Sequence, residues 1–308
     1  MMSWGDYLIS FLKEASNNVL IAAPFIRSAA LSRLLESIPE SVDTRIITRW
    51  RPADVLSGAS DLGVYDIAEA KSIPLLLRND LHAKLFIADD QSIVGSANVT
   101  EIALGWRQPP NLELLVQVNP FSSGIEAFVE ELITGSVRAT RIHQHHLARL
   151  VEQLSSSPPT AFNEVSKGET TSSVLPPNWI PRAMNPEELY DVYSLGHEAD
   201  VSRTTLPGML EEVARFSVIP NLSEPEFIAW IACSIIQTPL VQGVFEHIGC
   251  QGSVNEIALT QLLNNIGIKD DNSPRAVLLT LQRWLTHFLE DSYETTPESI
   301  RLMRTKRV

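Results

Sequence analysis

The sequence has 308 residues and a formal net charge of -13 at pH 7, a length that favours two domains, each with its own core. Residues 1–150 carry 13 Lys+Arg and 17 Asp+Glu, whereas residues 151–308 carry 11 and 20. Both halves are acidic, which excludes a broad basic face for nucleic acid and requires any phosphate recognition to be local.

Cysteine usage and hydropathy indicate where the protein resides. The two cysteines, Cys233 and Cys250, form no CxxC pair, so neither a disulfide framework nor a zinc site is expected. No apolar run reaches the roughly 18 residues of a membrane span, and the N-terminus lacks the pattern of a secretory leader. We therefore expect a soluble, cytoplasmic protein that is not associated with a membrane.

The first 80 residues alternate between helical and extended patterns. Apolar spacing predicts helices over 4–17 and 28–38 and a helical segment over 66–70. Short β-rich apolar runs predict strands at 18–26, 43–50 and 72–79, and a later one at 111–118. Strands that alternate with helices predict an α/β fold with a central sheet.

Residues 81–98 read as two strands joined by an Asp-Asp-Gln turn, with polar residues in unusual places. On a strand, residues two apart share a face, so His82 and Lys84 point away from the apolar face that contains Leu85. On the returning strand, Ser96 and Asn98 share a face after Gly95, where the absence of a side chain allows close approach of a ligand.

If these strands pair as a hairpin, four polar side chains converge on one patch: His82, Lys84, Ser96 and Asn98. Imidazole is a nucleophile that is neutral near pH 7, and the ammonium group is a fixed cation. The hydroxyl and the amide donate hydrogen bonds to non-bridging oxygens. The patch therefore has the groups that a phosphodiester requires.

The pattern His82-x-Lys84-x4-Asp89 followed by Gly95-Ser96-x-Asn98 resembles the HKD motif of the phospholipase D superfamily. The similarity extends over roughly residues 1–150 and takes in IAAPFI at 21–26, SGASD at 57–61 and Asn111-Leu112-Glu113. One departure is that five residues separate Asp89 from Gly95, one fewer than the family pattern. The resemblance implies a phospholipase D-like mixed-sheet α/β sandwich, which a mainly α-helical C-terminal domain follows.

The resemblance also implies roles for these residues. His82 would attack phosphorus and form a phosphohistidine, while Lys84, Ser96 and Asn98 hold the phosphoryl oxygens. Glu113 would accept a hydrogen bond from the far nitrogen of His82. Asp89 and Gly95 would be structural, and the family's chemistry needs neither a metal nor another cofactor.

The family's reaction uses two histidines, a nucleophile and a general acid, but this chain has one HxK. None of its other six histidines has a lysine two positions on. Single-motif members of the family form homodimers in which two motifs meet at the axis. The resemblance therefore implies a twofold homodimer with one composite active site.

Three residues at the end of the second predicted strand, Arg49, Trp50 and Arg51, are candidates for substrate contact, with the tryptophan stacking on a base. The alternative is a rim with a partly buried tryptophan. His143, His145 and His146 crowd one predicted helix but have no acidic partner nearby in sequence, which favours packing or solvation over metal binding. No metal site is expected.

The remaining sequence divides into three parts. Residues 121–154 have helical periodicity, residues 155–181 form a Ser/Thr/Pro-rich linker, and residues 182–308 contain several helices. We expect the catalytic domain to be residues 1–154. Ser273 and Pro274 have the form of an N-cap and a first helical residue.

Two kinds of structure fit the C-terminal domain, and each implies a different function. The helical pair around VNEIALTQLL and SPRAVLLTLQRWL fits a winged-helix or helix-turn-helix unit, or else a bundle that binds a protein partner. The basic end RLMRTKRV either touches nucleic acid or is a disordered terminus.

The resemblance implies a metal-independent phosphodiesterase, most readily a nuclease in a bacterial restriction or phage-defence system, because single-motif members of the family are mostly nucleases. Nucleic acid is then the substrate, and the C-terminal domain targets or regulates the enzyme. The alternatives are a phospholipase, or a DNA-binding or scaffolding subunit with the same fold and little catalysis.

Overall fold

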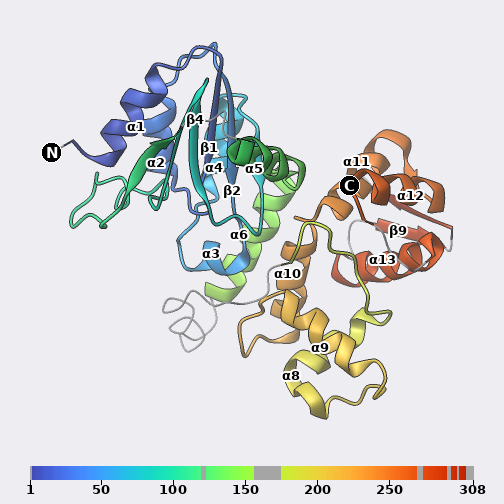
Figure 1. The fold of residues 1–308 in the computed structure, drawn as a ribbon. Helices are drawn as coiled ribbons and strands as arrows, with labels where there is room; N and C mark the ends of the chain where they lie inside the picture. Colours follow the sequence, from blue (N-terminus) through green and yellow to red (C-terminus); the bar gives the residue numbers. More distant parts are fainter. Residues whose placement is uncertain are drawn as a thin grey trace, which may run out of the picture. The chain divides into compact units, whose positions relative to one another are not determined.

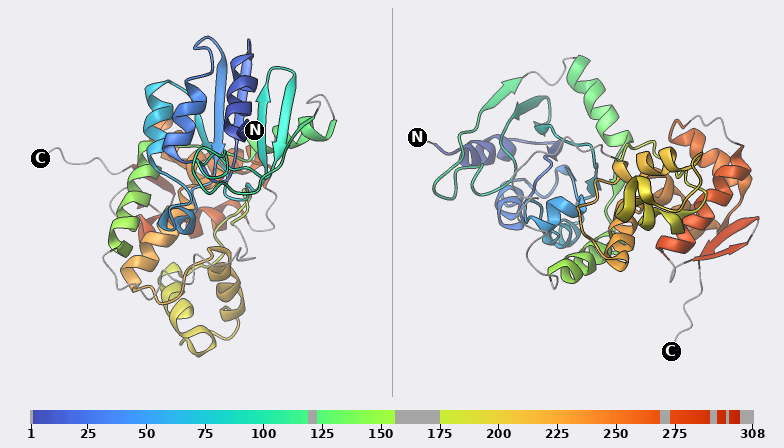
Figure 2. Two further views of the ribbon diagram at one scale, coloured as in Figure 1. Left: turned by 90° about the vertical axis from the view of Figure 1, so that its left-hand side faces the viewer. Right: turned by 90° about the horizontal axis from the view of Figure 1, so that it is seen from below.

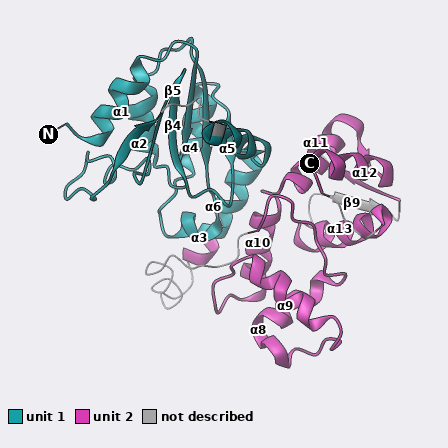
Figure 3. Cartoon of the chain, in the orientation of Figure 1, with its two compact units in different colours: residues 1–151 teal, residues 152–308 magenta. Residues whose placement is uncertain are grey.

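The computed structural model describes residues 2–118, 123–155, 175–268, 273–289, 293–296 and 298–302. The chain divides into two compact units, Met1–Val151 and Glu152–Val308 (Figure 3). Each unit has its own buried core and is described by itself.

Unit 1 is built on a seven-stranded sheet in the order β6-β5-β4-β1-β2-β3-β7 (Figure 1). The parallel centre consists of β1 (Asn18–Ala22), β2 (Asp43–Thr48) and β3 (Leu75–Leu77). Antiparallel strands extend it on one side, namely β4 (Lys84–Ala88), β5 (Gln91–Gly95) and β6 (Leu115–Val118). On the other side β7 (Val137–Arg138) pairs with β3. The sheet is therefore mixed, as the sequence predicted.

Helices cover both faces of this sheet (Figures 1 and 2). They are α1 (Trp4–Lys13), α2 (Ser28–Leu35), α3 (Pro52–Leu56), α4 (Gly63–Ala70), α5 (Ser123–Thr134) and α6 (Arg141–Ser155). α1 packs on α2 and β4, whereas α4 packs on α2 and β3. Leu132 of α5 lies on the opposite face in a cluster with Leu20 and Leu85. The helices thus enclose β1 and β4 from both sides.

The strands of unit 1 are shorter than the apolar runs that predicted them. β1 ends at Ala22 rather than at residue 26, since Pro24 has no N–H to continue the ladder. β3 begins only at Leu75, after Ser72 with its positive φ of 56° and Pro74. The prediction of continuous helix over 121–154 is wrong, because β7 separates α5 from α6.

Unit 2 is mainly helical. Its helices are α8 (Leu189–Leu195), α9 (Leu206–Arg215), α10 (Glu224–Ile235), α11 (Pro239–Gln251), α12 (Glu256–Asn265) and α13 (Pro274–Phe288), with single turns η2 (Pro186–Glu188) and η3 (Gly196–Glu198). A small sheet in the order β8-β10-β9 is added by β8 (Ser253–Val254), β9 (Tyr293–Thr296) and β10 (Ser299–Leu302). The predicted fold class, a mixed-sheet α/β fold followed by a mainly helical region, is confirmed.

Helix starts in unit 2 follow from local sequence. The Ser273 hydroxyl accepts a hydrogen bond from the Ala276 N–H at 3.3 Å and Pro274 is the first helical residue, which confirms the predicted start of α13. Thr238 caps α11 ahead of Pro239, and this break divides the apolar run at 225–249 into α10 and α11. Among the described residues no single helix could cross a membrane, although α10 and α11, bent by 78°, meet the length and composition criteria as a pair.

The last residues of the predicted linker pack into unit 2. Trp179 is buried, and its indole N–H donates to the Glu212 carboxylate at 2.9 Å. Its ring also meets Trp284 edge-on, with centroids 5.3 Å apart. Burial raises the pKa of Glu212. Residues 175–181 therefore belong to a core rather than to a linker, whereas residues 156–174 lie outside the described residues.

Candidate functional site

The hairpin of β4 and β5 closes through a two-residue turn, Asp89-Asp90, in which Ala88 pairs with Gln91. Asp89 has a positive φ of 53°, a conformation that Asp tolerates better than most residues. Its carboxylate accepts backbone N–H bonds from Ser16 and Asn17 at 2.7 Å and from Asn18 at 2.9 Å. These hydrogen bonds, with that from Asn18 the largest contribution, lower the pKa of Asp89.

The hairpin has a regular register with only five residues between Asp89 and Gly95. The ladder continues without a bulge from Ala88 and Gln91 to Lys84 opposite Gly95. The register thus sets His82, Lys84 and Ser96 at the far end of the hairpin from the turn.

His82 and Lys84 lie where the chain enters this hairpin. β4 begins at Lys84, so His82 is in the preceding segment and not on the strand, contrary to the alternation that we predicted. The His82 side chain is exposed, whereas Lys84 is half-buried. The Lys84 ammonium donates to the His82 carbonyl at 2.9 Å, which fixes the backbone beside the imidazole.

Ser96 and Glu113 meet where β5 ends and the chain approaches β6. The Ser96 hydroxyl donates to the Glu113 carboxylate and accepts the Leu114 N–H at 3.0 Å. Asn111 also donates to Glu113 at 3.2 Å. The structure therefore brings Glu113 to Ser96, while a hydrogen bond from His82 to Glu113 stays a prediction.

Asn98 is anchored to the segment that follows β1. Its side-chain oxygen accepts the Phe25 N–H at 3.3 Å. Next to it, the Val99 N–H donates to the Phe25 carbonyl at 3.1 Å, and the Arg27 N–H donates to the Val99 carbonyl at 2.9 Å. Since the oxygen of Asn98 is engaged, its amide nitrogen is the part oriented to donate, which suits an anionic substrate oxygen.

Gly95 has a structural reason to be glycine. A Cβ at this position would overlap the backbone carbonyl of Leu114 and the side chain of Leu115. The strand β6 and its lead-in therefore approach the Gly95 backbone closely, whereas the sequence predicted that a ligand would do so.

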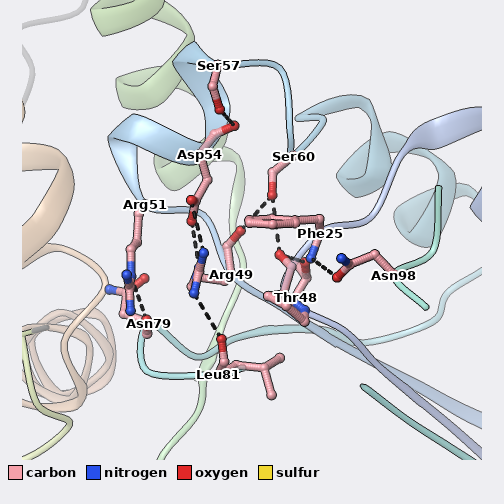
Figure 4. A network of polar contacts seen from close by, with 11 residues as sticks. Phe25, Thr48, Arg49, Arg51, Asp54, Ser57, Ser60, Asn79, Leu81 and Asn98 are labelled. Atoms are coloured by element: carbon pink, nitrogen blue, oxygen red, sulfur yellow. Dashed lines mark hydrogen bonds and ion pairs between the residues drawn. The ribbon is translucent and has the colours of Figure 1, made fainter. Parts of the chain in front are cut away.

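A buried cation network lies beneath the entrance to the hairpin (Figure 4). The Arg49 guanidinium binds the Asp54 carboxylate through two nitrogens, at 2.6 and 3.1 Å. A third nitrogen donates to the Leu81 carbonyl at 3.2 Å, and the guanidinium carbon lies 4.9 Å from the centroid of the Phe25 ring. Arg49 therefore joins the residue before His82 to the segment that anchors Asn98.

Of the three candidate substrate contacts after β2, only Arg51 fits that role. Trp50 is 0% exposed, so the prediction that it stacks on a base is wrong, and Arg49 is 7% exposed and engaged with Asp54. Arg51 is half-buried and donates to the Asn79 carbonyl at 2.7 Å. Burial and the charge of Arg49 lower its pKa to about 10, which leaves it cationic at neutral pH.

The histidines of α6 lie apart from this motif in the sequence. The His143 ring is buried, and its Nδ1 lies 3.0 Å from the Thr140 backbone nitrogen and 2.9 Å from the Thr140 hydroxyl, at the start of the helix. Burial lowers the pKa of His146. Within the described ranges no three His, Cys, Asp or Glu side chains form a group that could hold a metal ion.

No protein-family model and no curated protein matches the sequence. Among solved structures, NucT from Helicobacter pylori is similar at 18% identity and a TM-score of 0.35, over 44% of this chain and 89% of that one. Phosphatidylserine synthase from Haemophilus influenzae Rd KW20 is similar at 13% identity and a TM-score of 0.39, over 51% of this chain and 44% of that one.

TrmBL2, an archaeal chromatin protein, is similar at 17% identity and a TM-score of 0.28, over 43% of this chain and 49% of that one. The chain therefore spans less than half the length of the synthase and of TrmBL2. At these scores the similarities carry no argument about activity, which rests on the residues of the chain itself.

The sequence analysis expected Arg49 to contact substrate and missed its pairing with Asp54. The spacing of Arg49 and Asp54 is that of many surface pairs, and nothing local shows that both are withdrawn from solvent. The only sequence signal is the position of Arg49 at the end of a strand whose neighbours carry motif residues.

Proposed function

We propose that the protein is a metal-independent phosphodiesterase that cleaves nucleic acid, with His82 as its nucleophile. The observation that supports this most strongly is the register of the hairpin. It sets Lys84 opposite Gly95, with His82 two residues before the first and Ser96 directly after the second. The Ser96 hydroxyl donates to the Glu113 carboxylate, and Asn98 lies two residues after Ser96.

In the first step an imidazole nitrogen of His82 attacks phosphorus. The bond to the leaving oxygen breaks as the phosphohistidine forms, and a second, protonated histidine gives its proton to that oxygen. Lys84 and Asn98 stabilise the charge on the non-bridging oxygens, whereas the one O–H of Ser96 donates to Glu113 and holds that carboxylate. In the second step the other histidine takes a proton from water, which attacks phosphorus and releases His82.

We further propose that the second histidine is His82 of another copy of the chain. An exposed apolar strip supports such a dimer, formed by Leu112, Leu114 and Val116 with exposed fractions of 103%, 63% and 45%. These residues alternate along β6 and its lead-in and so share one face. The strip flanks Glu113 at an edge strand of the sheet, where a second copy would cover it.

The deciding experiment uses the full chain with EDTA and four substrates: single-stranded DNA, duplex DNA, RNA and phosphatidyl lipid vesicles. We expect cleavage of nucleic acid that survives the chelator and falls by at least ~10³-fold in His82→Ala. The matched control is His145→Ala, which removes an exposed histidine from α6 and should keep wild-type activity.

Other outcomes would assign a different function. Cleavage of lipid alone would make the protein a phospholipase, and binding of DNA without cleavage of any substrate would make it a scaffolding subunit. Quenching in alkaline detergent, in which phosphohistidine is stable, with substrate labelled at the scissile phosphate should trap the label on the wild-type protein and not on His82→Ala.

We also propose a bacterial restriction or phage-defence role, which follows from the nuclease assignment. Cells that express the wild-type chain should lower phage plating efficiency relative to cells that express His82→Ala at equal level. Equal plating on the two strains would contradict this role and leave the enzymatic proposal intact.

A further inference from the structure

The C-terminal part of unit 2 has a distinctive order of elements. Residues 239–302 run helix, strand, helix, helix, strand, strand, as α11, β8, α12, α13, β9 and β10. α11 packs on α12, β8 and β10, while α13 packs on α12 and β9 (Figure 1). The Gln282 amide donates to the Thr296 carbonyl at 2.6 Å, which ties α13 to the β9–β10 hairpin.

α13 has one buried side and one polar, exposed side. Its apolar residues are buried, with Trp284 and Leu285 at 0% exposure. Its exposed residues are Arg275, Arg283 and Thr286. At 100° per residue these three lie within roughly 80° of one another around the helix. The exposed side therefore presents two guanidinium groups and a hydroxyl, which suits an anionic partner better than an apolar one.

The guanidinium of Arg283 has a partly fixed position. One nitrogen donates to the Met184 carbonyl at 2.9 Å and to the Asn185 side-chain oxygen at 3.3 Å. The side chain stays exposed. A guanidinium has five N–H donors, so these contacts leave others to bind phosphate and orient the group at little entropic cost.

The hairpin beside α13 adds a further cation. Ile300 on β10 is fully buried and pairs with the fully buried Val254 on β8. Arg301 is the next residue and is exposed, as the alternation of a strand requires.

Charge is distributed unevenly along unit 2. Residues 182–272 contain four Lys+Arg and thirteen Asp+Glu, a net charge of -9. Among the described residues from Ser273 onward there are three Lys+Arg and two Asp+Glu, a net charge of +1. The acidic remainder would repel a polyanion except where this local excess of cations lies.

We propose that residues 239–302 form a winged-helix module that binds duplex DNA through the exposed side of α13. An α-helix fits the major groove of B-DNA, and arginines on such a helix contact phosphates or guanine edges. The β9–β10 hairpin is the wing and supplies Arg301 beside the helix. This binding goes beyond the proposed catalysis, because it requires no residue of the β4–β5 hairpin.

The test measures binding of the full chain to a labelled 30-base-pair duplex by fluorescence anisotropy over a series of salt concentrations. His82→Ala is the background throughout, so that cleavage does not interfere. We expect Arg275→Gln/Arg283→Gln to weaken binding by about 10-fold or more and to reduce the salt slope by about two. The matched control is Arg203→Gln, which removes an exposed arginine ahead of α9 and should leave affinity and slope unchanged.

Arg283 also holds residues 184 and 185, so the double variant is checked by its thermal midpoint. Arg275→Gln alone removes no contact to those residues and should reduce the slope by about one. Affinity and slope equal to those of the Arg203→Gln control would overturn the proposal. A background protein that binds no duplex at low salt would also overturn it. Variants of α13 that change only the oligomeric state would overturn it too, because the exposed side of α13 would then be a protein interface.

Discussion

At the scale of single residues, Asp89 joins the tip of the hairpin to the chain that enters β1. Its carboxylate accepts three backbone N–H groups, whereas its neighbour Asp90 is exposed. We expect Asp89→Ala to lower the free energy of unfolding by about 2 kcal/mol, because these charge-assisted bonds are lost. Asp90→Ala, in the same turn, should change it by less than about 0.5 kcal/mol.

The effect of Asp89 has a definite pH dependence. Its pKa is lowered on folding, so its ionised form stabilises the native state above the unfolded value of about 3.8 and this stabilisation is lost as pH falls below it. Urea unfolding of both proteins at pH 7 and pH 3 measures this. The gap between wild type and Asp89→Ala should narrow at the lower pH, and a constant gap would contradict the charge argument.

Arg49 offers a second prediction at this scale. Arg49→Met would leave the carboxylate of Asp54, 13% exposed, without its cation, and should cost about 3–5 kcal/mol in urea unfolding. Arg45→Met is the control, since Arg45 pairs with Asp43 on the surface, and it should cost less than about 1 kcal/mol. Equal effects of the two substitutions would show that the buried pair contributes no more than a surface one.

The candidate site was predictable to the extent that it is local in sequence. His82, Lys84, Ser96 and Asn98 interrupt apolar runs, and their spacing, which resembles a known motif, marks them in the sequence. The burial of Trp50 was not predictable, because it depends on elements distant in sequence that cover the end of β2. The same holds for the partner of Glu113, which depends on how β5 and β6 end beside one another.

At the scale of elements, β6 is the most exposed part of the sheet that borders the motif. It is an edge strand, and two exposed apolar side chains share one face, Val116 on the strand and Leu114 in its lead-in. We expect Leu114→Asp/Val116→Asp to convert a dimer into a monomer in light scattering and to abolish cleavage, because buried carboxylates oppose association. Ile142→Asp, at an exposed apolar position on α6, is the control and should remain dimeric and active.

A second measurement distinguishes a loss of association from a loss of folding in the double variant. Far-UV circular dichroism of the double variant should match wild type, since both side chains lie on the surface. A wild-type chain that is monomeric at micromolar concentration would contradict the composite site, whatever the substrate proves to be.

Elements were predictable in proportion to their length. The long amphipathic helices and the central strands have enough residues to show periodicity, and α13 also has a clear N-cap. β7 and β8 contain two residues each, too few for any alternation to be visible. Their existence depends on pairing with β3 and β10, which are distant in sequence.

At the scale of the whole molecule, each unit encloses its own large apolar side chains. Leu8, Leu12 and Phe86 are fully buried in unit 1, and Trp230 and Trp284 are buried in unit 2. Each unit is also long enough to bury a core without the other. The chain should therefore behave as two folding domains.

We expect residues 1–155 to fold alone, as a single cooperative transition in thermal unfolding. Residues 1–140 are the control, because they lack α6, whose Leu147 and Leu150 are fully buried and whose Arg141 pairs with Asp66 and Glu69. Removing these apolar side chains exposes the surface they cover and should cost several kcal/mol, enough to abolish the transition. If residues 1–155 failed to unfold cooperatively, the two cores would depend on each other. If they unfold cooperatively and cleave DNA with weaker substrate affinity than the full chain, catalysis belongs to unit 1 and unit 2 contributes to binding.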